Sequence, residues 1–235
     1  GNSLHDNTIS TPDQLLEWIE KACLQKKGKL IIPAFSVGRT QEIVYMMDQL
    51  ATHGRLPRIP VFVDSPLAVD ATDVFIQHPE CYDAELNRYM QTDPNPFGFR
   101  HLQYLRKVEE SKALNEREGA FVVISSSGMA NAGRVKHHIF NNIDNPNTTI
   151  LIVGYASPQT PAGQLRDGAR VIHLFGEAKT VQARIEVMDS FSAHADYKEI
   201  MAFLDNQKSH LEHLYLVHGD YDTQQTFADT LRKTG

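Results

Sequence analysis

The stretch KLIIPAFSVGRTQ, residues Lys29–Gln41, decides the fold class of this chain. Its first five residues, Lys29–Pro33, form an apolar run with the length of a buried strand. The loop Ala34–Thr40 follows with small and hydroxyl residues, and residues 39–53 then repeat apolar side chains at helical spacing. A buried strand that leads through a short loop into a helix is the repeating unit of a parallel α/β sheet.

The same unit recurs along the chain. Residues 60–64, 120–124 and 149–153 are further candidate strands, and a helix is expected from Pro66 toward His78. Before the first strand, the run that starts at Thr11 predicts a helix with Thr11 as its N-cap and a proline at its first position. We therefore expect an α/β fold with a largely parallel sheet flanked by helices.

The pattern changes near residue 178, where we place a boundary between a domain of residues 1–178 and an incomplete segment of residues 179–235. Residues 180–188 alternate polar and apolar side chains, as in a strand with one covered face. A helix from about Asp196, a strand over residues 213–217 and a helix from about Asp222 should follow.

Composition restricts the class of protein. The chain of 235 residues has a formal net charge of −6, which argues against a sequence-blind nucleic-acid coat but allows a nuclease with a locally positive cleft. Its two cysteines, Cys23 and Cys81, stand in no CxxC pair, so we expect a reduced, cytoplasmic location. No apolar run is long enough to span a membrane.

The loops that follow the predicted strands carry the candidate phosphate- or RNA-binding residues, Ser36, Arg39, Ser127 and Gly128. Functional groups of open α/β sheets gather at the carboxyl ends of the strands. Hydroxyl groups and free backbone amides before a helix suit an anion. The same residue types also suit ordinary strand-to-helix turns, so each loop taken singly leaves both interpretations open.

Two histidines lie in comparable positions farther along. Ser192 and His194 precede a predicted helix, where the hydroxyl group can hold a phosphate and the imidazole can donate a proton to a leaving oxygen. His218 ends the strand predicted over residues 213–217, which is a usual position for a metal ligand. A single histidine in either place is also common as a structural residue.

Taken together, these motifs resemble the β-CASP nucleases. The resemblance rests on PAFSVGRTQE (Pro33–Glu42), DSPLA (Asp64–Ala68) and SSGM (Ser126–Met129), followed by SFSAHAD (Ser190–Asp196) and LVHGD (Leu216–Asp220). The last two are similar to that family's motifs B and C. All five motifs occur in the family's order, and together they extend over nearly the whole chain.

The resemblance implies a phosphodiesterase with two zinc ions that hydrolyses RNA. Its β-CASP domain is inserted into a metallo-β-lactamase αββα fold, of which residues 179–235 would be the C-terminal piece. It implies that His194 is a candidate proton donor, that His218 binds zinc and that Ser192 contacts phosphate. The histidine at motif C resembles the pattern of the RNA-processing branch of the family.

The sequence lacks the family's His-x-His-x-Asp-His motif, its further ligand histidine and its bridging aspartate. Because catalytic zinc sites need about three protein ligands, we expect this chain alone to lose its zinc and to be inactive. Apolar residues such as Ile185, Met188, Leu214 and Leu216 would then lack a partner. We therefore expect either self-association, including a homo-oligomer, or loose order after residue 178.

Two alternatives remain open. The chain could be a non-catalytic module that binds RNA or assembles with another subunit, or it could belong to a DNA-processing nuclease. The sequence does not distinguish endonucleolytic from exonucleolytic cutting.

Overall fold

The computed structural model describes residues 10–191, 195–217, 219 and 221–234. Two compact units divide the chain: one spans Ile9–Phe191, and the other combines Gly1–Thr8 with Ser192–Gly235. The first unit thus extends past residue 178, where the sequence predicted a domain boundary, and that boundary stays a prediction.

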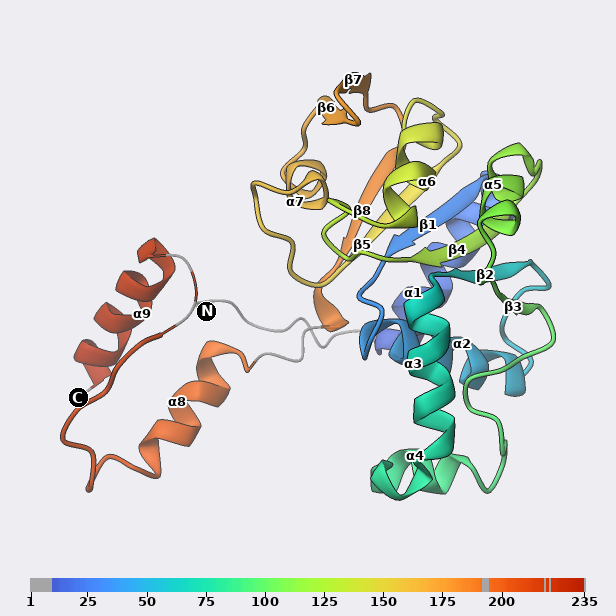
Figure 1. Ribbon diagram of the computed structural model, residues 1–235. Helices are drawn as coiled ribbons and strands as arrows, with labels where there is room; N and C mark the ends of the chain where they lie inside the picture. The colour runs from blue at the N-terminus through green and yellow to red at the C-terminus, as the bar shows by residue number, and fades with distance from the viewer. Residues whose placement is uncertain (1–9, 192–194, 218, 220, 235) are drawn as a thin grey trace. The chain divides into compact units, whose positions relative to one another are not determined.

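Helices and strands alternate through the first unit, as Figure 1 shows. The strands are β1 (Lys29–Pro33), β2 (Val61–Asp64), β3 (Leu102–Tyr104), β4 (Phe121–Ser125), β5 (Thr149–Val153), β6 (Val171–Leu174), β7 (Glu177–Thr180) and β8 (Arg184–Met188). The helices are α1 (Thr11–Ile19), α2 (Arg39–Thr52), α3 (Pro66–Gln77), α4 (Ala84–Tyr89), α5 (Val108–Glu116), α6 (Arg134–Asn142) and α7 (Pro161–Arg166). A π-helix (Glu20–Gln25) continues α1, and 3-10 turns lie at Pro79–Cys81 and Asp189–Phe191. Within the described residues, no helix is both long and apolar enough to cross a membrane.

Six of the strands form one parallel sheet in the order β3-β2-β4-β1-β5-β8. The central strands β1, β2 and β4 are buried along almost their whole length. Such strands read as continuous apolar runs because helices cover both faces of the sheet. The predicted fold class, a largely parallel sheet flanked by helices, is confirmed.

Helices lie on both faces of the sheet (Figure 1), and each face has its own core of buried side chains. Successive side chains of a strand point to opposite faces. Leu30 and Ile32 of β1 therefore pack with α1, α2 and α3, whereas Ile31 packs with α5, α6 and α7. The antiparallel hairpin of β6 and β7 covers part of the second face through Ile172 and Leu174.

The first helix begins one residue earlier than the sequence predicted. Ser10 is the N-cap of α1, and its Oγ accepts a hydrogen bond from the backbone N–H of Asp13. Thr11 is the first helical residue and Pro12 the second, so the prediction of Thr11 as N-cap is wrong. Either hydroxyl type satisfies an N-cap, and local sequence distinguishes poorly between neighbouring candidates.

The single strand predicted over residues 180–188 is also wrong, because the chain changes sheets there. Gln182 and Ala183 each donate a backbone hydrogen bond to Ile143 O, which takes them out of the β7 ladder. β8 then pairs with β5 along its whole length. Met188 is buried in one core and Ile185 packs against the other, so neither lacks a partner as expected from the sequence.

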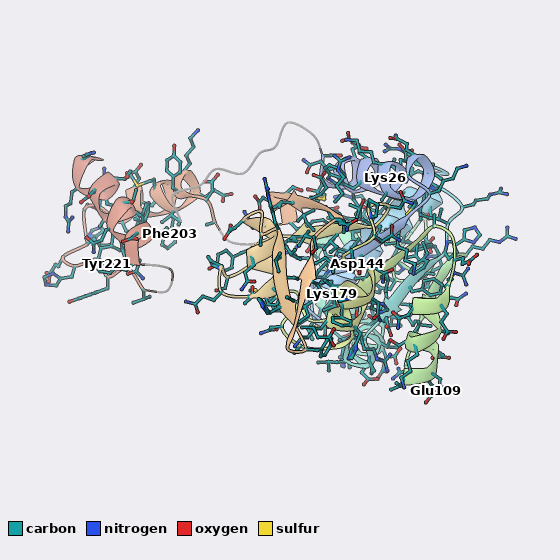
Figure 2. The ribbon with its side chains drawn as sticks, turned by 90° about the horizontal axis from the view of Figure 1, so that it is seen from above. Lys26, Glu109, Asp144, Lys179, Phe203 and Tyr221 are labelled. Carbon is teal, nitrogen blue, oxygen red and sulfur yellow. The ribbon has the colours of Figure 1, made fainter. Side chains whose placement is uncertain are left out.

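The described part of the second unit consists of α8 (Tyr197–Asp205), α9 (Tyr221–Thr234) and a connection without strands. The helix predicted from about Asp196 is α8; Asp196 is its N-cap and forms a capping box with Glu199. Residues 213–217 form no strand; a strand needs a neighbouring strand for its ladder, and no described segment supplies one. Phe203 and Tyr221, labelled in Figure 2, are 67% and 72% exposed.

Candidate functional site

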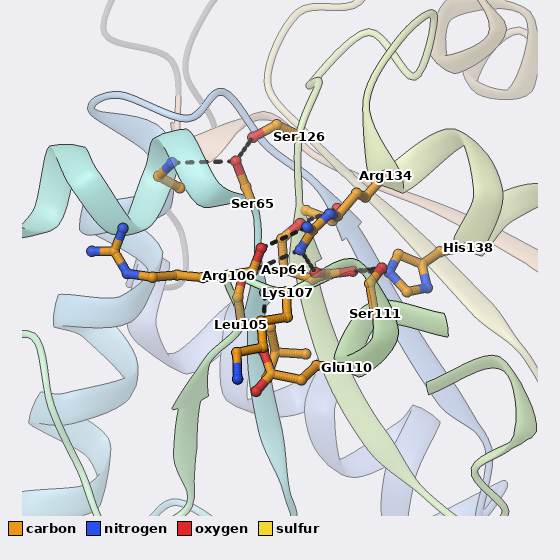
Figure 3. Close-up of polar contacts among 12 residues, drawn as sticks. Asp64, Ser65, Leu105, Arg106, Lys107, Glu110, Ser111, Ser126, Arg134 and His138 are labelled. Carbon is orange, nitrogen blue, oxygen red and sulfur yellow. Dashed lines mark hydrogen bonds and ion pairs between the residues drawn. The ribbon is translucent and has the colours of Figure 1, made fainter. Parts of the chain in front are cut away.

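Three serine hydroxyl groups meet at the carboxyl ends of β1, β2 and β4. Ser36 Oγ lies 2.7 Å from Ser126 Oγ and 3.3 Å from Ser65 Oγ. Ser126 Oγ donates to Ser65 Oγ across 3.1 Å, the contact drawn in Figure 3. Because β2, β4 and β1 are parallel neighbours, their carboxyl ends lie at one edge of the sheet. We call these three residues the serine cluster.

The serine cluster can both donate and accept hydrogen bonds, because a hydroxyl group has one proton and two lone pairs. Ser65 is buried, and its Oγ also accepts a hydrogen bond from the Ala68 N–H at the first turn of α3. Ser36 and Ser126 are only partly buried. An anion that reached them could accept hydrogen bonds from both hydroxyl groups after a rotation about each Cβ–Oγ bond.

Gln41 holds the β1–α2 loop in place. Its Oε1 accepts a hydrogen bond from Gly38 N, and its Nε2 donates to Ser36 O at 3.1 Å and to Ala68 O at 3.2 Å. The same Nε2 contacts Thr72 Oγ1 at 2.9 Å, and the side chain is buried. Gln41 therefore fixes Ser36 relative to α3, a role that the sequence analysis did not assign to it.

Arg39, a predicted phosphate-binding residue, already has intramolecular partners. Its guanidinium group forms an ion pair with Glu42 and lies 5.0 Å from the ring centroid of Phe191. Burial lowers the pKa of Arg39, and burial also raises the pKa of Glu42. For both groups the cost of desolvation outweighs the attraction between the two charges, so the pair orients Arg39 without adding much to the stability of the loop. The RNA-binding role of Arg39 stays a prediction.

Ser127 and Gly128, the other two predicted contacts, lie in the loop after β4. Ser127 Oγ donates to Asn131 Oδ1 at 2.8 Å, so this hydroxyl group is engaged within its own loop. Gly128 lies against Phe35, since a Cβ at that glycine would be 3.2 Å from the aromatic ring. Ser126 rather than Ser127 joins the serine cluster, while the binding roles of Ser127 and Gly128 stay predictions.

A buried carboxylate anchors the edge of the sheet that carries the serine cluster (Figure 3). Asp64, fully buried at the end of β2, accepts hydrogen bonds from Ser111 Oγ at 2.5 Å and from Arg134 Nη1 at 2.7 Å. His138 Nε2 lies 2.6 Å from the same carboxylate. Ser125 Oγ donates to the backbone oxygen of Asp64 at 2.7 Å. These contacts join β2, β4, α5 and α6 directly below Ser65.

The hydrogen bonds decide the charge of this carboxylate. Burial alone raises the pKa of Asp64, but the hydrogen bonds from His138, Ser111 and Arg134 outweigh it and hold that pKa below its ordinary value. Sequence reasoning treated His138 as an ordinary residue. The available indication was the spacing of Arg134 and His138, which places both on one side of α6.

The remaining predicted residues, Ser192, His194 and His218, lie outside the described residues. In the part of the chain that the structure describes, no group of three or more His, Cys, Asp or Glu side chains could hold a metal ion. The described donor set therefore does not fit a zinc site.

Two family descriptions match the chain. The Beta-Casp domain matches residues 40–165, and the Zn-dependent metallo-hydrolase RNA specificity domain matches residues 179–235. The second description implies the use of a metal.

Curated relatives cover most of this chain. Ribonuclease TTHA0252 of Thermus thermophilus is 32% identical over 94% of the chain and 49% of its own length. An RNase J-like protein of Methanocaldococcus jannaschii is 28% identical over 94% of the chain and 50% of its own length. The transcription termination factor FttA of Methanosarcina mazei is 26% identical over 90% of the chain and 34% of its own length.

The chain thus spans half or less of the length of these relatives. The Beta-Casp match itself covers more than half of the chain and runs from the first turn of α2 to the last turn of α7. The parallel sheet flanked by helices and the two family descriptions agree that this chain belongs to the β-CASP family.

Proposed function

We propose that the whole protein hydrolyses RNA phosphodiester bonds in a metal-dependent reaction, and that this chain positions the RNA. The observation that carries the proposal is the serine cluster, in which Ser36 and Ser126 lie partly exposed at the edge where parallel sheets bind ligands. Relatives named as ribonucleases, and the family description that names RNA specificity, support RNA as the substrate.

The serine cluster suits a phosphodiester oxygen. Hydroxyl groups fixed by the surrounding fold donate to an anion with little reorganisation. Ser65 follows Asp64, whose carboxylate is held by Ser111, Arg134 and His138 (the Asp64 network), and its Oγ is also bonded to Ala68 N of α3. Gln41 holds Ser36 through a hydrogen bond to Ser36 O. The RNA backbone is therefore held by groups whose positions are set before it binds.

Other roles within this proposal belong to residues outside the described part. His194 donates the proton to the leaving oxygen, Ser192 contacts phosphate, and His218 is one ligand of a site that holds two zinc ions. Its other ligands come from a part of the whole protein that this chain does not supply. The domain division near residue 178, the cytoplasmic location and a homo-oligomeric state belong to the same proposal.

The test uses the whole protein, a labelled single-stranded RNA and a single-stranded DNA of the same sequence. We expect cleavage of the RNA that stops on addition of a chelator and falls strongly in His194→Ala. Ser36→Ala should raise the KM for RNA, whereas Ser209→Ala, an exposed serine of the second unit, serves as the matched control. Cleavage that persists in the chelator, or a strict preference for DNA, would overturn the proposal.

A further inference from the structure

Two adjoining hollows lie at the outer edge of the sheet, beside β3. The larger has a volume of 570 Å³ and lies between α3 and β3, and the smaller has a volume of 280 Å³ and lies beyond the end of α2. Phe99 and Arg100 line both, so the two hollows adjoin at these residues, and we treat them as two parts of one groove. We call it the Arg58–Arg100 groove after the two arginines that line its smaller part.

The smaller part of the groove is positively charged. Arg58, Arg100 and His101 line it, and no Asp or Glu is among its described lining residues. Both arginines are exposed, and no carboxylate of the described residues lies within ion-pair distance of either. On a chain with a net charge of −6, two guanidinium groups that line the same hollow, neither with a carboxylate partner in the described part of the chain, form a local site for an anion.

The larger part of the groove is aromatic and almost neutral. Phe97 is buried at its floor, and Phe99 and Tyr104 line it as partly buried rings. Tyr104 Oη donates to Phe97 O at 2.7 Å, which fixes the two walls relative to each other. Its one lining carboxylate, Asp73, is paired with Arg106 at 2.5 Å.

The smaller part of the groove is separate from the serine cluster. His101 lies at the amino end of β2, where its backbone oxygen accepts a hydrogen bond from Val61 N. Ser65 follows the carboxyl end of the same strand. Because β2 runs between them, one ligand group cannot occupy both places at once.

We propose that the Arg58–Arg100 groove binds one nucleotide of single-stranded RNA, with its base beside Phe99 and its phosphate on Arg58 and Arg100. The volume of the larger part is in the range of small-molecule sites. Single-stranded RNA is recognised through bases stacked on aromatic rings and phosphates held by arginine, which are the two kinds of group that this groove brings together. The choice of RNA rests on the proposed function; the groove itself is a second contact, away from the place of cleavage.

The first experiment measures binding of a fluorescent ten-nucleotide single-stranded RNA to this chain. Compared with the wild type, the double variant Arg58→Gln/Arg100→Gln should bind at least about fivefold more weakly, and the slope of log affinity against log salt should fall by about 0.7, because one phosphate loses its cationic partners. Phe99→Ala should also weaken binding by about fivefold or more, but without a change in that slope. The matched control is Arg88→Gln/Arg170→Gln, which removes two exposed arginines elsewhere and should bind as the wild type does.

Equal affinity of the Arg58→Gln/Arg100→Gln variant and the wild type would overturn the groove as an RNA site. So would an absence of RNA binding by the chain, or displacement of the RNA by an oligoglutamate peptide as readily as by unlabelled RNA. In the whole protein, the same double variant should raise the KM for RNA and leave kcat unchanged. If the whole protein binds RNA through the groove but never cuts it, the proposed function fails and the groove stands. If the whole protein cuts RNA and the double variant has the same KM as the wild type, the groove fails as an RNA site and the proposed function stands.

Discussion

Asp48 is a buried carboxylate that should make the stability of this chain depend on pH. It lies on α2, is 1% exposed, and accepts a hydrogen bond from Tyr89 Oη at 2.7 Å. Its other oxygen, Oδ1, has no hydrogen-bond partner among the described residues. Burial raises the pKa of Asp48 to about 6, the negative charge of Asp93 adds to that rise, and the hydrogen bond from Tyr89 opposes it.

The size of the effect follows from this pKa. A carboxyl group with a pKa near 3.8 in the unfolded chain and about 6 in the folded chain binds its proton more tightly in the folded state. Each pKa unit is worth about 1.4 kcal/mol, so the ionised side chain destabilises the fold by about 3 kcal/mol above pH ~6. The penalty grows as the pH rises from ~4 to ~6, and it is absent at lower pH.

Asp48→Asn should remove this pH dependence, because the amide is neutral throughout the range. Urea unfolding followed by the fluorescence of Trp18, the single tryptophan, gives the free energy of unfolding. The free energy of unfolding of the wild type, relative to that of Asp48→Asn, should rise by about 2 kcal/mol when the pH falls from ~7 to ~4.

Two further variants distinguish this effect from a general change in net charge. Tyr89→Phe removes the hydrogen bond that opposes the rise, so its stability should depend more steeply on pH than that of the wild type. Asp167→Asn removes an exposed carboxylate and reports the effect of net charge alone. A wild-type minus Asp48→Asn difference that stays constant from pH ~4 to ~7 would refute the reasoning.

Asp64→Asn should lower the free energy of unfolding by about 3 kcal/mol near neutral pH, measured by urea unfolding, because it leaves Arg134 without its buried charge partner. Since the pKa of Asp64 is depressed in the fold, the extra stability of the wild type over Asp64→Asn should disappear as the pH falls through that pKa. Extra stability that persists in acid would contradict an ionised Asp64. Gly133→Ala should destabilise by more than about 2 kcal/mol, since φ is +75° and a Cβ would lie 2.2 Å from Ser126 O. Gly168→Ala, also left-handed but with open space, should cost only about 1 kcal/mol by the same assay, and equal losses would show that the clash is relieved. Gln41→Ala should cost about 2 kcal/mol because buried backbone and hydroxyl groups lose their partner; an unchanged unfolding midpoint would contradict that role.

Local sequence predicted the elements whose cause is local. The strand Lys29–Pro33 and the helices that follow residues 38 and 65 appear within a residue of the predicted bounds. Buried parallel strands require apolar residues on both faces, and helix starts require a cap and a compatible first turn. The family motifs are also local, so they identified the chain before its sheet order was known.

Tertiary packing decided the properties that depend on distant partners. Residues 184–188 joined the main sheet because β5 offered them a free edge, while residues 213–217 formed no strand because no described segment pairs with them. Asp64 and His138 are 74 residues apart, and nothing near either residue announces the other. The Arg58–Arg100 groove is likewise made by two loops that only the order of β2 and β3 brings together. The sequence by itself therefore determined the strands β1, β2, β4 and β5, the helices α1 to α3 and the family, because those follow from side chains close together in the chain. The serine cluster, the Asp64 network and the groove were decided by the tertiary structure, because hydrogen bonds and charges act over distances in space.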